Sequence, residues 1–181
     1  MSLTKLTMLT KPTMKNKTIV YLAKGEKEKS ALLKRRAVED YFGKAELSVT
    51  KKGKPIIVEP QGYGISVSHS GDVIAVVIAP AEVGIDIQER FERDNSRMLS
   101  FFHESEREND FYDLWTKKES YGKMTGDGIF SQKGKRLETD AVFIDISKEI
   151  SEYAEKEFSA KICLDKKTMQ DVEYTIKVDF A

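Results

Sequence analysis

The first half of the chain contains six short segments whose apolar residues are bounded by turn residues. They are residues 18–23, 47–50, 56–58, 65–68, 73–79 and 83–87. Segments of this length between Gly, Pro and Asp are typical of β-strands. Ser70 and Gly71 lie between the fourth and fifth segments, so these two are predicted to form a hairpin, which Pro80 ends. In the last segment apolar and polar residues alternate, which predicts a strand with one polar face.

A helix is predicted between the first two strands, from the break at Gly25 to the stop at Gly43. Leu33, Ala37 and Tyr41 recur at four-residue steps, which places them on one face of a helix. Gly43 is predicted to end it, because glycine adopts the backbone conformation that helix ends require. Basic residues crowd the opposite face.

The second half is predicted to run from helices to strands. Residues 96–102 suit a short helix and residues 105–124 a longer one, which Gly126 and Gly128 end. Strands are predicted at residues 142–146, 160–164 and 174–178, with polar connections between them. The predicted fold class is therefore α+β, with an N-terminal half of residues 1–80 and a C-terminal half of residues 81–181. The seam between them is predicted at residues 80–83, where Pro80 interrupts the pattern.

Composition narrows the function classes. The chain has 181 residues, of which 40% are hydrophobic and 33% are charged, as expected of a globular protein. The 30 basic residues equal the 30 acidic ones, so the sequence does not predict a nucleic-acid partner. Cys163 is the single cysteine, and residues 1–17 lack the apolar core of a secretory leader. The longest apolar stretch, residues 73–80, is too short for a membrane helix. We therefore expect a cytoplasmic protein without a membrane span.

Asp86 is the first residue that suggests chemistry. It lies in the run Val-Gly-Ile-Asp-Ile-Gln, where an ionised carboxylate is costly unless a cation or a hydrogen-bond donor meets it. Gly84, two residues earlier on the same face, leaves room for a close approach. The alternative interpretation is a water-facing acid near the end of a strand.

Glu119 and Lys123 are four residues apart on the longer predicted helix, which also suits an ordinary surface ion pair. Trp115 lies one turn earlier on the same stripe, so both charged groups are expected at the edge of the buried face. A hard cation such as Mg²⁺ prefers one or two carboxylates with water and phosphate oxygens, which Asp86 and Glu119 would supply.

His69 is predicted at the hairpin turn beside Ser68, Ser70 and Gly71. Amides and an imidazole in such a turn suit a phosphate, although a turn histidine without a function is equally compatible with the pattern. Two histidines and one cysteine argue against a zinc site of the Cys/His type. The chain contains neither a P-loop nor a Gly-x-Gly-x-x-Gly fingerprint.

Several of these segments together resemble one family. Residues 84–87 (GIDI), 101–106 (FFHESE) and 115–128 (WTKKESYGKMTGDG) occur in the order and spacing of the 4'-phosphopantetheinyl transferases, specifically the larger surfactin-synthetase-activating type. Upstream, residues 53–55 (GKP) and 66–72 (SVSHSGD) resemble the segments with which that family contacts coenzyme A. Each piece is short, and the WTKKES helix is the most specific.

The resemblance implies two similar α/β halves in a pseudo-twofold arrangement, with coenzyme A in the cleft between them. It implies transfer of 4'-phosphopantetheine from coenzyme A to a carrier-protein serine, with Mg²⁺ as cofactor and adenosine 3',5'-bisphosphate as the released product. Asp86 and Glu119 match the family's metal-binding carboxylates. Gln88 stands where this type carries a further acid, and an amide in that place should weaken metal affinity.

The remaining roles are also implied by the resemblance. Glu106 matches the acid that orients or deprotonates the incoming serine, and Glu119 and Lys123 complete the catalytic set. Lys123 and His69 match contacts to the coenzyme A phosphates. Lys54 and Pro55 match the adenine-side segment, and Ser68 a neighbouring phosphate contact. Which basic residue holds the 3'-phosphate stays open between Lys29, Arg35 and Arg36.

Two other functions are compatible with these residues. Gln88 raises the alternative of a coenzyme A-binding protein that has lost transfer, and a different Mg²⁺-dependent phosphodiester enzyme would release nucleotide without a carrier. The expected partner is an apo acyl or peptidyl carrier protein. The sequence does not separate fatty-acid, polyketide and nonribosomal-peptide carriers. We expect a monomer, because the two-lobed type that the chain resembles usually works as a single chain.

Overall fold

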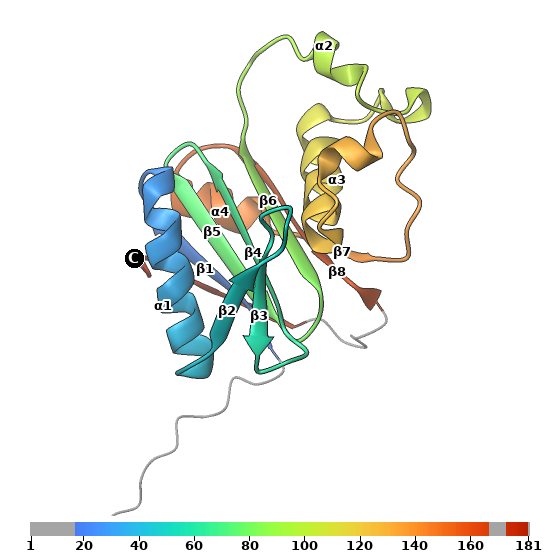
Figure 1. Cartoon of the computed structure of the whole chain (residues 1–181). Helices are drawn as coiled ribbons and strands as arrows, with labels where there is room; N and C mark the ends of the chain where they lie inside the picture. Colours follow the sequence, from blue (N-terminus) through green and yellow to red (C-terminus); the bar gives the residue numbers. More distant parts are fainter. Residues whose placement is uncertain (1–16, 167–172, 181) are drawn as a thin grey trace, which may run out of the picture.

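The computed structural model describes residues 17–166 and 173–180, so the N-terminal arm before residue 17 lies outside the described residues. It is a mixed α/β structure (Figure 1). The strands are β1 (Thr18–Lys24), β2 (Glu46–Val49), β3 (Pro55–Glu59), β4 (Gly64–Ser70), β5 (Val73–Ala79), β6 (Val83–Glu89), β7 (Val142–Asp145), β8 (Phe158–Leu164) and β9 (Tyr174–Lys177). The helices are η1 (Lys27–Lys29), α1 (Ser30–Phe42), α2 (Ser96–Leu99), η2 (Glu104–Glu106), α3 (Phe111–Thr125), η3 (Ile129–Gln132) and α4 (Ser147–Ala154).

The first sheet has the strand order β4-β5-β1-β9. β4 and β5 form the predicted hairpin, β5 pairs antiparallel with β1, and β9 from the far end of the chain pairs parallel with β1. Helix α1 covers one face of this sheet (Figure 1). Its apolar stripe of Leu33, Ala37 and Tyr41 is buried there, and Gly43 ends the helix with a φ of 75°.

The second sheet is antiparallel, with the order β6-β8-β7. Helix α3 packs against β6 and β8 (Figure 1). A methyl group added at Gly84 of β6 would lie 1.9 Å from the carbonyl oxygen of Ser120 on α3. The close approach that Gly84 was expected to permit is therefore made by the protein's own helix.

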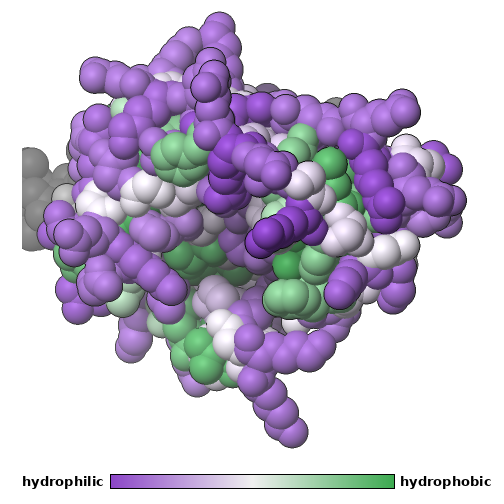
Figure 2. All heavy atoms as spheres, turned by 90° about the horizontal axis from the view of Figure 1, so that it is seen from above, coloured by the Kyte–Doolittle hydropathy of each residue, from purple (hydrophilic) through white to green (hydrophobic). Residues whose placement is uncertain are grey.

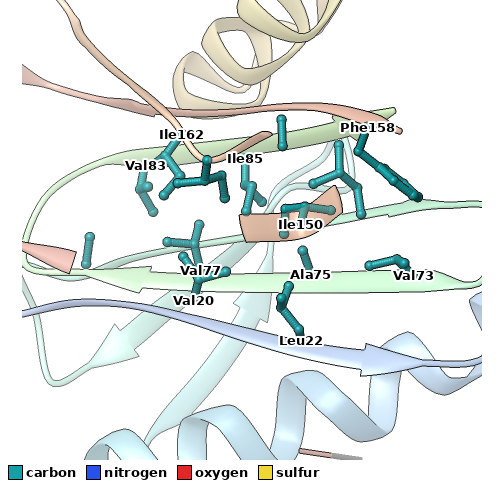
Figure 3. Packing of buried hydrophobic residues seen from close by; sticks show 14 of the residues in the cluster. Val20, Leu22, Val73, Ala75, Val77, Val83, Ile85, Ile150, Phe158 and Ile162 are labelled. Atoms are coloured by element: carbon teal, nitrogen blue, oxygen red, sulfur yellow. The ribbon is translucent and has the colours of Figure 1, made fainter. Parts of the chain in front are cut away.

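β2 and β3 pair antiparallel as a separate hairpin, and the main apolar core lies between the other two sheets. Side chains of β1 and β5 point toward those of β6 and β8, with Ile150 of α4 between them (Figure 3). Because the core joins residues from both halves of the chain, packing there fixes the position of β6 relative to β4 and β5.

The predicted strands are confirmed, with ends that differ by a few residues. Helix prediction in the second half was less accurate. Residues 96–102 are helical only to Leu99, because Phe101 and Phe102 turn inward to an aromatic cluster with Phe111. The predicted helix 105–124 is interrupted and restarts at Phe111, where the side chain of Asp110 accepts the N–H of Asp113 at 2.8 Å.

Helix α4 was not predicted, because its sequence had been assigned to a polar connection. Ile150 and Ala154 are buried at a four-residue step in an otherwise polar segment.

Within the described residues, no helix combines the length and the apolar character that crossing a membrane requires. The face in Figure 2 is mostly hydrophilic, with hydrophobic residues visible in hollows between the polar side chains.

Candidate functional site

The polar face of β6 carries the predicted metal-site residues toward α3. Asp86 is 5% exposed, and its Oδ1 accepts hydrogen bonds from the Ser68 hydroxyl at 2.9 Å and from the Lys123 ammonium at 2.7 Å. Its other oxygen, Oδ2, is buried without a hydrogen-bond partner in the described part of the chain. Burial raises the pKa of Asp86, and the Lys123 charge offsets only part of that effect. The alternative of a water-facing acid is therefore wrong.

Glu119 faces the same cleft from α3. It is half-buried, and its Oε2 also lacks a hydrogen-bond partner among the described residues. Burial raises the pKa of Glu119, Lys123 lowers it, and the negative charge of Asp86 raises it further. Asp86 and Glu119 thus bring two carboxylates to one cleft, each with a buried oxygen that lacks a partner among the described residues, and such oxygens are the ligands that a hard divalent cation prefers.

Gln88 lies two residues beyond Asp86 on the same face and is half-buried. Its amide nitrogen donates to the Ser70 hydroxyl at 3.2 Å, which leaves the amide oxygen as the atom able to coordinate a cation. Within residues 17–166 and 173–180, no three His, Cys, Asp or Glu side chains gather in a metal-binding cluster. The metal role of Asp86, Gln88 and Glu119 therefore stays a prediction.

These residues line one cleft of about 630 Å³ between α1 and α3. Ser68, His69, Asp86, Gln88, Glu119 and Lys123 all contribute to it. His69 lies on β4 and not in the predicted turn, is exposed and lines the cleft, as does Lys27 just before α1. Lys29, Arg35 and Arg36, the residues considered for the 3'-phosphate, are not part of this lining.

Lys54 and Pro55 line a neighbouring hollow of about 290 Å³, which shares Lys123 with the cleft. The Lys54 ammonium is bonded to the Glu82 carboxylate and to the main-chain carbonyl of Met124 at the end of α3. Its charge therefore ties the β2–β3 hairpin to the C-terminal half. Pro55 follows directly and is held beside the hollow.

Glu106 lies apart from this cluster and is not among the residues that line the cleft. Its carboxylate is 2.8 Å from the ammonium of Lys118, whose side chain is fully buried, and it accepts the N–H of Leu137 at 3.1 Å. Burial acts to raise the pKa of Glu106, but the hydrogen bonds from Lys118 and Leu137 outweigh it and the pKa is lowered. Lys118 also donates to the carbonyl of Lys135 at 2.6 Å.

Sequence reasoning assigned no role to Lys118, Ser66 or Ser70. Lys118 could have been recognised because it is a charged residue on the apolar face that Phe111 and Leu114 form. For the serines the signal was their alternation along a strand that leads to His69.

Comparisons with known proteins agree with the sequence resemblance. Residues 82–177, more than half of the chain, match the 4'-phosphopantetheinyl transferase superfamily. The chain is 34% identical over 88 residues to the 4'-phosphopantetheinyl transferase psf-1 of Bacillus pumilus, which covers 42% of this chain and 38% of that protein. It is 36% identical over 89 residues to the transferase gsp of Aneurinibacillus migulanus, covering 43% of this chain and 37% of that protein.

A third relative is the 4'-phosphopantetheinyl transferase ffp of Bacillus subtilis, 33% identical over 94 residues, which cover 45% of this chain and 42% of that protein. The chain thus spans about two fifths of the length of the curated relatives that it matches.

Proposed function

Because this chain belongs to the 4'-phosphopantetheinyl transferase superfamily, we propose that it transfers the 4'-phosphopantetheine group of coenzyme A to a serine of an apo carrier protein. The serine oxygen forms a new bond to the phosphorus of the pantetheine phosphate, and the bond from that phosphorus to the bridging oxygen of the pyrophosphate is broken, so that the bridging oxygen leaves with the nucleotide phosphate. The serine proton passes to an acceptor on the enzyme or to water, and adenosine 3',5'-bisphosphate leaves.

The observation that carries this proposal is the convergence of Asp86, Glu119 and Lys123 on one cleft. We propose that Asp86 and Glu119, with the amide oxygen of Gln88, hold Mg²⁺. When bound, the ion would supply positive charge against the coenzyme A pyrophosphate. Phosphoryl-type transfer depends mainly on positioning and charge neutralisation, so no nucleophilic side chain is required.

The chain's own cations are proposed to act on the leaving group. Lys123 lies in the cleft beside Asp86 and His69 lies at the edge, so both are near any phosphate bound there. Their hydrogen-bond donors would stabilise negative charge on the departing nucleotide phosphate. Lys54 and Pro55 would support the adenine side from the neighbouring hollow.

Glu106 is proposed to act on the serine proton indirectly, through a bridging water. Its carboxylate is paired with buried Lys118 and lies outside the lining of the cleft, which disfavours direct contact with the substrate. Its lowered pKa also makes it a weaker base than an ordinary glutamate.

We further propose that the two halves are related by an internal twofold. In support, the sheet of β4, β5 and β1, which β9 extends, has the long helix α1 packed on it, and the sheet of β6, β8 and β7 has the long helix α3. The partner proposed is an acyl or peptidyl carrier protein, and the enzyme is proposed to act as a cytoplasmic monomer.

Mass spectrometry of intact carrier proteins tests the transferase proposal. The purified protein, Mg²⁺ and coenzyme A are incubated with a panel of apo acyl and peptidyl carriers, each beside a variant whose acceptor serine is alanine. We expect a phosphopantetheine mass gain on at least one carrier and on none of the alanine variants. No gain across the panel would contradict the proposal.

Gln88 favours one second candidate, a coenzyme A-binding protein without transfer. An amide brings less negative charge than the carboxylate of the family pattern, so the metal affinity would be too low for catalysis. Coenzyme A binding without turnover at saturating Mg²⁺ would support this candidate, whereas turnover that requires raised Mg²⁺ supports the transferase. Nucleotide release in the absence of a carrier would instead indicate a phosphodiester enzyme.

A further inference from the structure

Three alternate serines of β4 face the main chain of β6. They are Ser66, Ser68 and Ser70, here called the serine seam, and all three are buried. Their hydroxyl oxygens accept the main-chain N–H groups of Ile85, Ile87 and Glu89, in that order, at 3.2, 3.2 and 2.9 Å. The spacing is that of a strand, in which every second residue lies on the same face.

The seam supplies hydrogen bonds that neither sheet provides. The backbone of β6 pairs with β8 along one edge, and the backbone of β4 pairs with β5. The N–H groups of β6 that point toward β4 would be buried without partners, which is costly. The two strands are also very close, since a methyl group at Gly64 would lie 2.9 Å from the main-chain nitrogen of Val83 at the start of β6.

Two of the three serines additionally hold a side chain of β6. Ser68 donates to Oδ1 of Asp86 at 2.9 Å, and Ser70 accepts the amide nitrogen of Gln88 at 3.2 Å. Each of these serines thus bonds two consecutive residues of β6. It bonds the side chain of the first and accepts the main-chain N–H of the second. At Ser66 the corresponding residue is Gly84, which has no side chain to hold.

The hydrogen-bonding capacity of Ser68 is fully used. A serine hydroxyl has one hydrogen and two lone pairs. The hydrogen goes to Asp86, and the oxygen accepts from the N–H of Ile87 at 3.2 Å and from the Lys123 ammonium at 3.0 Å. No donor or acceptor is left on Ser68 for a phosphate oxygen unless one of these bonds is broken.

We propose that Ser68 is a positioning residue that orients Asp86, and that it is not a phosphate contact. By fixing Oδ1, Ser68 and the seam direct the free Oδ2 of Asp86 to the cleft, and Ser70 does the same for the amide oxygen of Gln88. This inference rests on the proposed metal role of Asp86 and Gln88. Partners of this kind orient metal ligands and tune their affinity.

Binding measurements separate orientation from phosphate contact without relying on turnover. The Kd for Mn²⁺, read from the electron paramagnetic resonance signal of the free ion, is compared for the parent protein, Ser68→Ala and Ser66→Ala. The Kd for coenzyme A is measured by calorimetry in EDTA for the parent and Ser68→Ala. Ser66→Ala is the matched control, because it loses the same bond to a β6 N–H but holds no side chain. Ser68→Cys is a second variant that keeps the side-chain size if Ser68→Ala does not fold.

We expect Ser68→Ala to raise the Kd for Mn²⁺ about 10-fold or more, the range seen when a partner of a metal ligand is lost. Its Kd for coenzyme A in EDTA should equal that of the parent, and Ser66→Ala should leave Mn²⁺ binding unchanged. A weaker affinity for coenzyme A with unchanged Mn²⁺ binding would overturn the inference in favour of a phosphate contact. Equal loss of Mn²⁺ affinity in Ser66→Ala would reduce Ser68 to a structural role. If the parent binds no Mn²⁺, the proposed metal site itself is wrong and the inference falls with it.

Discussion

Lys123 on α3 and Asp86 on β6 are joined by an ion pair of 2.7 Å in the lining of the cleft. Asp86 is nearly inaccessible to water, so its negative charge depends on Lys123 and Ser68 for stabilisation. Glu119 lies one helical turn before Lys123 and faces the same cleft. The helix therefore brings a second carboxylate and a cation to the strand in a single packing contact.

The first prediction concerns the two carboxylates. Asp86→Asn and Glu119→Gln keep the size of each side chain and remove its charge, and burial already raises the pKa of both groups. We expect both variants to fold as well as the parent. Transfer should fall by at least about 100-fold, because a metal ion supplies several kcal/mol of charge stabilisation and each tenfold in rate is about 1.36 kcal/mol.

Carrier modification followed by mass spectrometry measures the rates, and circular dichroism with thermal melting checks the fold. Glu152→Gln, an exposed acid on α4, is the matched control and should keep full activity. Parent-like turnover in either cleft variant would remove that residue from the metal role.

The second prediction concerns the buried pair of Glu106 and Lys118. Glu106→Gln leaves the fully buried ammonium of Lys118 without its counter-charge, which typically costs about 3–5 kcal/mol. Lys118→Met should destabilise in the same range. The double variant should recover part of the loss, since it leaves no charge uncompensated. Urea unfolding of the four proteins gives the coupling, and additive losses would contradict it.

The contribution of the Glu106–Lys118 pair to the free energy of unfolding should decrease as the pH falls. Because the pKa of Glu106 is lowered in the folded state, the unfolded chain binds more protons in acid than the native one does. The stability difference between the parent and Glu106→Gln should be full at neutral pH. It should shrink as the pH falls below about 4.5, the ordinary pKa value of a glutamate. A difference that grows in acid would contradict this assignment.

Activity of the same variants tests the catalytic role of Glu106. If Glu106 accepts the serine proton through water, Glu106→Gln should lower kcat and remove the acidic limb of the pH–rate profile. Lys118→Met keeps the carboxylate and frees it from its partner, so its acidic limb should remain and move to higher pH. Equal losses of kcat with unchanged profiles would show that the pair only holds residues 135–137 in place.

A further prediction concerns Gly84. A methyl group there would overlap the Ser120 carbonyl, which belongs to the helix backbone and has no room to rotate away. Gly84→Ala should therefore push α3 from β6 and destabilise the protein by about 1–3 kcal/mol. Since the same contact brings Glu119 to Asp86, Mn²⁺ affinity should fall together with the melting temperature. An unchanged melting temperature would contradict this close packing.

Most of the fold was predictable where one periodicity dominates. The stripe of Leu33, Ala37 and Tyr41 buries one face of α1, and the apolar residues that alternate along β6 pack into the main core, so local pattern and tertiary packing agree. α4 was missed because only Ile150 and Ala154 reach the core from a mainly polar segment. The interruption before Phe111 was missed because a capping aspartate looks like any other acid in a charged run.

The candidate site was predictable in its members but not in its connections. Alternation placed Asp86 and Gln88 on one face, and the four-residue step placed Glu119 near Lys123. Which of these side chains bond to one another depends on how closely the strand and the helix pack, and a local sequence pattern does not encode that distance. The tie from Lys54 to Met124 and the pairing of Glu106 with Lys118 are contacts of this kind.

The last prediction is that Gln88→Glu strengthens metal binding. Gln88 lies beside Asp86 on β6 and lines the cleft, so a carboxylate there would add negative charge to the two acids already present. Hard cations bind more tightly as the number of charged oxygen ligands rises, and the repulsion between three carboxylates, which Lys123 offsets in part, is relieved further when the cation binds. We therefore expect a lower Mg²⁺ concentration for half-maximal transfer, a lower Kd for Mn²⁺ and a lower melting temperature in EDTA.

Gln88→Leu is the control, because it keeps the bulk but supplies no oxygen, and it should raise the Mg²⁺ concentration needed for half-maximal transfer. Identical Mg²⁺ titrations for all three proteins would show that residue 88 does not contact the ion.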